Sequence, residues 1–319
     1  MFINMYIVSI TGIEVLTDFI KDDEEAQLLK HIDEVPWDLS QSGRYKQNYG
    51  PKCNFKKRKV NSKTFEGYPL FTEFIQERFK SLDLLSSFEA VEQCSLDYSP
   101  DRGSSIDPHI DDCWVWGERI PTLSMAADSV LTLIRFKGHE AKYNLIDAQS
   151  YPRVVGEDGI VKEIGDVERE LRVLNGSEEV KEMENGFDRS KSFVSQDGME
   201  SIEKGENNSE KEAKRSERVC NSLELKPSGN GIEDSKSETE TFQVIRIPMP
   251  RRSLMVLYGG PRYEWEHCIL REDVMERRVC ITYRELTPTF LPFGPRAEAG
   301  AEILRKSKKF WDHKDGKAV

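Results

Sequence analysis

Short apolar stretches, several of them alternating with polar residues, recur along the 319-residue chain. Alternation with a period of two is typical of strands that bury one face, whereas a period near 3.6 indicates helices. The pattern predicts strands over residues 7–16, 92–99, 129–136, 242–247, 253–258 and 277–285. It predicts helices over residues 24–33, 69–82 and 297–310. Strands outnumber helices, so we expect a mainly β protein.

The predicted strand over residues 277–285 combines arginines with apolar residues. One face would present Arg278, Cys280, Thr282 and Arg284, and the other Val279, Ile281 and Tyr283. Buried arginines are costly unless they are paired, and guanidinium groups suit bidentate recognition of carboxylates. A dicarboxylate such as 2-oxoglutarate would meet this need. The alternative is an edge strand whose arginines face water.

Two segments far apart in the sequence contain candidate metal ligands. His109 and Asp111 are two residues apart, so on a strand they share a face. His267 is the best candidate for a third ligand. Two histidines and one carboxylate, with the other positions open, form the facial triad of non-haem Fe(II) oxygenases. Two alternatives remain: a zinc hydrolase built from the same residues, and a loop histidine with a locally hydrogen-bonded aspartate.

Taken together and in this order, these motifs resemble the signature of the AlkB family of Fe(II)/2-oxoglutarate dioxygenases. The similarity extends over roughly residues 10–140 and 242–295. It implies a double-stranded β-helix (jelly roll) with a flanking N-terminal α/β extension. Similar proteins carry a cysteine-rich N-terminal segment, which we expect this chain to lack.

The resemblance also implies roles for the site residues. The two histidines and the aspartate would hold Fe(II), with 2-oxoglutarate and O2 as co-reactants. Arg284 would pair with the metal-chelating carboxylate of 2-oxoglutarate, Arg278 with its distal carboxylate, and Tyr98 would hydrogen-bond it. The chain departs from the family at Cys280 and Leu96, where the family has asparagine. These departures remove two polar contacts.

The implied reaction is oxidative N-demethylation, which releases formaldehyde and succinate. The expected substrate is monomethyl-lysine in a protein such as actin, and the alternative is N6-methyladenine in DNA. Residues 41–60 are basic and lie where the family has its substrate lid, although a solvated loop is the alternative. The predicted substrate contacts are Tyr49, Lys52, Phe55, Trp114 and Trp116, with core packing as the alternative for the tryptophans.

Most of the net charge of −11 comes from residues 156–241, which hold 23 acidic and 13 basic residues. Phe187 and Phe193 are the aromatic residues there. Such a segment cannot bury enough apolar surface to offset its ordering entropy. We therefore expect a disordered acidic insert. A non-catalytic binding protein, with this insert as its working part, is a further alternative.

The expected organisation follows from these segments. Residues 1–91 would form the extension and lid, 92–155 and 242–295 the jelly-roll core, 156–241 the insert, and 296–319 a C-terminal helix and tail. The six cysteines form no CxxC pair, which favours free thiols in a reducing compartment. Because no apolar stretch approaches a membrane span, we expect a soluble, intracellular protein without a membrane partner. We further expect a monomer located in cytoplasm and nucleus.

Overall fold

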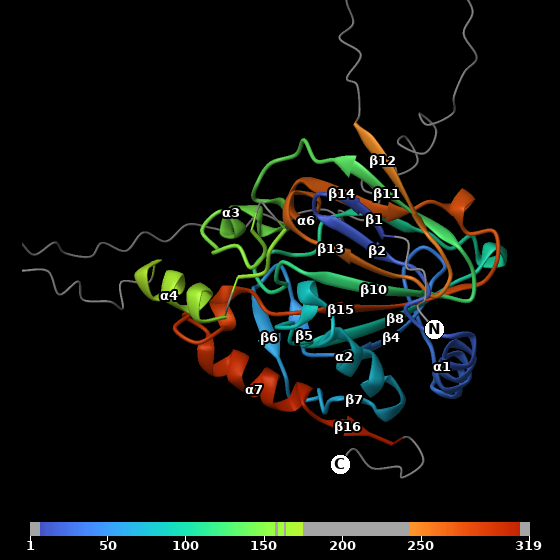
Figure 1. Cartoon of the computed structure of the whole chain (residues 1–319), viewed down its shortest axis with the longest axis horizontal. Helices are drawn as coiled ribbons and strands as arrows, with labels where there is room; N and C mark the ends of the chain where they lie inside the picture. Colours follow the sequence, from blue (N-terminus) through green and yellow to red (C-terminus); the bar gives the residue numbers. More distant parts are fainter. Residues whose placement is uncertain (1–6, 157–158, 163, 175–242, 313–319) are drawn as a thin grey trace, which may run out of the picture. The chain divides into compact units, whose positions relative to one another are not determined.

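Two antiparallel sheets dominate the computed structural model, which describes residues 7–156, 159–162, 164–174 and 243–312. The larger sheet has the strand order β1-β2-β13-β10-β15-β8-β4-β3, and the smaller has the order β12-β11-β14-β9 (Figure 1). The larger sheet comprises β1 Ile7–Ile10, β2 Ile13–Leu16, β3 Asp38–Leu39, β4 Tyr45–Tyr49, β8 Glu92–Tyr98, β10 Ile120–Met125, β13 Leu254–Leu257 and β15 Arg278–Arg284. The smaller comprises β9 Ile106–His109, β11 Ser129–Arg135, β12 Val244–Met249 and β14 Trp265–Ile269.

Helices and two small strand pairs complete the described residues. The helices are α1 Asp22–Glu34, α2 Glu73–Phe79, α3 Leu145–Ala148, α4 Ile164–Leu174, α6 Gly259–Glu264 and α7 Ala297–Ser307. Short 3-10 turns cover Leu70–Thr72, Asp83–Leu85, Pro100–Arg102, Lys142–Asn144, Arg271–Asp273 and Pro288–Phe290. The strands β5 Lys52–Asn54 and β6 Lys59–Asn61 form an antiparallel hairpin, and β7 Tyr68–Pro69 pairs in parallel with β16 Phe310–Trp311.

The central strand β15 divides its side chains between two cores, as its alternation predicts. Cys280 belongs to a buried cluster that also contains Leu131 and Leu133 of the smaller sheet, so this face looks between the sheets. Ile281 and Tyr283 belong to a second cluster on the opposite face. The mainly β jelly-roll class predicted from the sequence is confirmed, and the arginines of β15 lie on its inner face.

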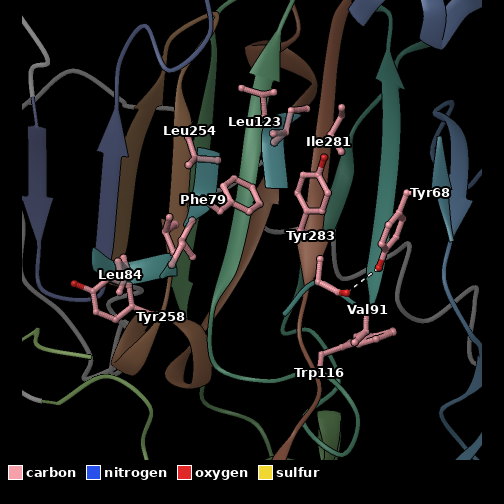
Figure 2. Packing of buried hydrophobic residues seen from close by; sticks show 14 of the residues in the cluster. Tyr68, Phe79, Leu84, Val91, Trp116, Leu123, Leu254, Tyr258, Ile281 and Tyr283 are labelled. Atoms are coloured by element: carbon pink, nitrogen blue, oxygen red, sulfur yellow. Dashed lines mark hydrogen bonds between the residues drawn. The ribbon is translucent and has the colours of Figure 1, made fainter. Parts of the chain in front are cut away.

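Helices cover the outer face of the larger sheet. The outer cluster draws residues from α1, α2 and α7, and Figure 1 shows α2 and α7 on the side of β10 and β15 away from β11 and β14. Phe79 of α2 meets Tyr283 edge-on, with ring centroids 5.2 Å apart (Figure 2). Buried aromatic pairs of this kind add to the stabilisation from burial alone. The outer layer therefore fixes β15 from behind.

The N-terminal segment and the start of the predicted insert are integrated into this unit. Strands β1 to β4 extend the larger sheet itself, so residues 41–60 are not only a loop. Helix α4 lies inside the range 156–241 that we expected to be disordered. Its apolar residues recur at helical spacing, Val167 is buried, and Lys162 pairs with Glu170. The prediction of disorder was wrong here because it used the composition of the segment and not the spacing of its apolar residues. The rest of the predicted insert lies outside the described residues.

Two expectations about the surroundings of the chain can be compared with the described residues. Cys53, Cys94, Cys113, Cys268 and Cys280 are free thiols, while Cys220 lies outside the described part. Within that same part, none of the helices has the length and apolar character needed to span a bilayer.

Candidate active site

The predicted metal ligands converge at one end of the smaller sheet. Strands β9 and β14 are neighbours, and His109 and His267 are direct register partners, with ring centroids 4.3 Å apart. Asp111 follows β9, and its Oδ2 lies 4.0 Å from Nε2 of His267. The fold therefore brings together three side chains that are far apart in the sequence.

The protonation states of these groups suit metal ligands, which must be a neutral imidazole or an ionised carboxylate. Burial lowers the pKa of His109, and it lowers the pKa of His267 to about 3. Burial alone would raise the pKa of Asp111, but the nearby charge of Arg284 is the largest opposing influence, and that pKa lies below its usual range. Nδ1 of His109 lies 2.8 Å from the carbonyl oxygen of Asp107. If Nδ1 donates there, Nε2 keeps the lone pair that a metal needs.

The three side chains also show what a metal ion would change. Oδ2 of Asp111 is buried without a hydrogen-bond partner, as expected for a ligand atom. Two donors about 2.1 Å from a metal and at right angles lie about 3 Å apart, about 1 Å less than the Asp111–His267 distance. Accordingly, the described residues contain no His, Cys, Asp and Glu group already closed to metal-holding distances. The donor set fits Fe(II) once the Asp111 side chain closes this gap.

Arg262 holds the backbone around Asp111 and was not identified from the sequence. This fully buried arginine of α6 donates hydrogen bonds to the carbonyl oxygens of Asp111 at 2.9 Å, Trp116 at 3.0 Å and Gly117 at 3.1 Å. Its Nη1 also lies 3.6 Å from Sγ of Cys113. A buried guanidinium bound to carbonyls fixes the loop that presents the aspartate. The sequence pattern alone does not show that Arg262 lies next to the Asp111 loop, because only the fold brings the two together.

Arg278 is a buried cation without a carboxylate partner among the described residues. Its side chain is 2% exposed, Nη2 donates to Oγ of Ser124 at 3.1 Å, and Nη1 lies 3.5 Å from Sγ of Cys280. Its Nε has no hydrogen-bond partner. Tyr98, its register partner on β8, lies with its ring centre 5.1 Å from the guanidinium carbon. An uncompensated buried charge of this kind is strongly unfavourable unless an anion joins it.

Arg284 already contacts two protein carboxylates, and its predicted pairing with the cosubstrate stays a prediction. Its Nη2 donates to Oδ1 of Asp111 at 2.8 Å, and its Nη1 donates to Oε2 of Glu92 at 2.6 Å. Two protein carboxylates therefore surround this guanidinium, and it orients the metal-ligand candidate Asp111. The Cys280 and Leu96 positions are register partners, and both side chains pack in the apolar cluster between the sheets.

The predicted substrate contacts fall into two groups, and the first lies in the β5–β6 hairpin and at the end of the preceding strand β4. Lys52 is exposed and Phe55 is 45% exposed, so both can meet a partner. The pKa of Cys53 in this hairpin is raised to about 12 by burial and by the nearby charges of Glu92 and Asp112. Tyr49 is half-buried, with its ring centre 5.8 Å from that of Trp311.

The two tryptophans form the second group. Trp114 and Trp116 are almost fully buried in the outer cluster, and the Trp114 ring lies 5.5 Å from that of Phe290. Trp116 lies among the core side chains drawn in Figure 2. The structure favours the packing alternative, because side chains buried this way offer no surface to a substrate.

Comparison with known proteins extends these observations. No protein-family model matches the chain. The human alpha-ketoglutarate-dependent dioxygenase alkB homolog 4 is 34% identical over 299 residues, which cover 94% of this chain and 75% of the human protein. A Caenorhabditis elegans DNA N6-methyl adenine demethylase is 38% identical over 128 residues, which cover 40% of this chain and 44% of that protein. The solved structure of OsALKBH1 aligns over 88% of this chain and all of its own, with a TM-score of 0.43 and 8% identity.

Proposed function

Because the chain belongs to the AlkB family of alpha-ketoglutarate-dependent dioxygenases, we propose that it demethylates N-methylated lysine with Fe(II) held by His109, Asp111 and His267. The dioxygenase class follows from the relatives, and the predicted family resemblance is thereby confirmed. The metal ligands and the substrate are the parts that we propose.

The observation that supports the proposal most directly is the unpaired guanidinium of Arg278. It lies on the inner face of β15, the same face that presents Arg284 to Asp111. A 2-oxo dicarboxylic acid has one end that can reach a metal and a distal carboxylate that can neutralise Arg278. A zinc hydrolase with the same ligands needs no dicarboxylate, so it would leave the buried charge of Arg278 without an anion.

The residues of the site divide the work of the reaction. Fe(II), when bound with 2-oxoglutarate and O2, supplies the oxidation of the N-methyl group that ends in formaldehyde, succinate and CO2. Arg278 fixes the cosubstrate from its distal end. Arg284 keeps Asp111 ionised and oriented, and Arg262 holds the backbone of that aspartate.

Replacing Arg262 with methionine is expected to weaken metal binding about 10–100-fold, because residues that hold a metal ligand in place typically contribute that much to metal affinity. Titration of the full chain with Mn(II) would measure the change. Arg262→Lys should give a smaller loss, since an ammonium group retains the charge but cannot reach all three carbonyls together. Unchanged Mn(II) affinity in a folded Arg262→Met variant would contradict the positioning role.

We favour a protein substrate on electrostatic grounds. Outside residues 156–241 the chain has 34 acidic and 33 basic residues and is nearly neutral. Tight nucleic-acid binding normally requires a broad basic surface. The basic β5–β6 hairpin is small, and it suits an acidic patch on a protein such as actin. The second candidate is N6-methyladenine in DNA, which the named activity of the C. elegans relative and the exposed Phe55 favour.

Paired assays test the substrate. The full chain would be incubated with Fe(II), 2-oxoglutarate and O2, with either monomethyl-lysine actin or N6-methyladenine DNA. We expect formaldehyde release with the protein substrate and none above background with DNA. Formaldehyde release with DNA alone would overturn the lysine proposal but keep the oxygenase chemistry. If neither the protein nor the DNA substrate gives formaldehyde or succinate, the demethylase proposal is contradicted.

A further inference from the structure

A tight turn holds Arg44 against the site. Ser42 and Gly43 adopt left-handed conformations, with φ of 52° and 70°. A Cβ on Gly43 would lie 2.3 Å from the carbonyl oxygen of Arg102, so only glycine fits there. The carbonyl oxygen of Gly43 accepts hydrogen bonds from Oγ of Ser104 at 2.7 Å and Nε of Arg102 at 2.9 Å. The backbone next to Arg44 is therefore fixed from two sides.

The Arg44 side chain is a second buried cation beside Tyr98. It is 7% exposed, Nη1 donates to the carbonyl oxygen of Ser105, and Nε is buried without a partner. Its guanidinium carbon lies 5.9 Å from the centre of the Tyr98 ring, compared with 5.1 Å for Arg278. Among the described residues neither arginine has a carboxylate partner. Asp97, the acidic neighbour of Tyr98 in sequence, pairs instead with Arg102 and Arg277.

We propose that Arg44 is a second guanidinium of the cosubstrate pocket and binds the distal carboxylate of 2-oxoglutarate together with Arg278. This inference rests on the proposed function and extends it. Two buried positive charges beside one tyrosine, each with an Nε that lacks a hydrogen-bond partner, favour the binding of an anion, and a carboxylate has enough lone pairs to accept from both. The pocket lacks polar side chains at Leu96 and Cys280. A second arginine supplies the contact that these apolar residues cannot.

The test compares two ligands that differ only in the distal carboxylate. Binding of 2-oxoglutarate and of 2-oxobutyrate to the Mn(II)-loaded full chain would be measured by calorimetry. Arg44→Gln is expected to weaken 2-oxoglutarate binding about 10–100-fold, because a charge-assisted hydrogen bond is lost. It should change 2-oxobutyrate binding less than about twofold. Arg44→Lys should show the same selectivity with a smaller loss, which covers the case of a poorly folded glutamine variant.

Arg102→Gln is the matched control, since Arg102 contacts the same turn and stacks on Tyr45 but pairs with Asp97. It should affect both ligands alike. Equal weakening of both ligands by the Arg44 variants, or wild-type affinity for both, would overturn the inference. If the wild-type chain itself fails to bind 2-oxoglutarate, the proposed function fails, so the two failures can be told apart.

Discussion

Replacing Arg278 with glutamine is expected to weaken 2-oxoglutarate binding by more than about 100-fold and to abolish succinate formation at ordinary cosubstrate concentrations. Truncating one partner of a buried, hydrogen-bonded charge pair costs about 2–5 kcal/mol, and about 1.4 kcal/mol corresponds to a tenfold change in affinity. Arg278 is 2% exposed, lies on the inner face of β15, and has no carboxylate partner among the described residues.

The same substitution should have the opposite effect on the ligand-free protein. Without an anion the wild-type guanidinium is an uncompensated buried charge, so glutamine at this position should not lower the melting temperature and can raise it. With 2-oxoglutarate at 100 times its dissociation constant, the wild-type chain should gain about 2.7 kcal/mol of stability. The Arg278→Gln variant should lose this ligand-dependent gain. Thermal melts with and without 2-oxoglutarate measure both effects.

Arg277→Gln provides the matched control. The neighbouring residue points to the other face of β15, where it pairs with Asp33 and Asp97. Its loss should lower stability modestly and leave 2-oxoglutarate affinity unchanged. If Arg278→Gln bound 2-oxoglutarate like the wild type, the buried cation would have a purely structural role.

The sequence predicted those parts of the site that depend on strand periodicity. Alternation along residues 277–285 separates the arginine face from Ile281 and Tyr283, and the structure places Cys280 of the arginine face in one core and these two residues in another. The order of the motifs predicted the family, and the comparisons confirm it. Periodicity works here because β15 is a central strand with both faces buried.

Contacts between distant side chains could not be predicted in this way. The pairing of Arg284 with Glu92 joins residues 192 positions apart, so its predicted role with the cosubstrate was assigned without knowledge of that carboxylate. Arg44 and Arg262 lie outside the strand motif, and only the fold brings them to Tyr98 and to the Asp111 loop. Helix α4 was missed because acidic composition outweighed the spacing of its few apolar residues.

Replacing His267 with alanine is expected to lower the affinity for Mn(II) or Fe(II) by more than about 100-fold and to abolish succinate formation. Losing a group that only holds a metal ligand in place lowers metal affinity about 10–100-fold, and losing a ligand atom itself should lower it further. Asp111→Ala should have the same effect on the metal and should also leave Arg284 paired with Glu92 alone. Calorimetric titration with Mn(II) reports the binding without depending on turnover.

The control is His31→Ala, which removes a histidine on α1 that pairs with Glu34. It should bind Mn(II) like the wild type. The two ligand positions are also expected to behave non-additively: the double variant Asp111→Ala/His267→Ala should be no less active than either single variant, because each single loss already prevents the ion from being held. Full succinate formation in either single variant would rule out these ligands. The register pairing of His109 with His267 would then have only a structural role.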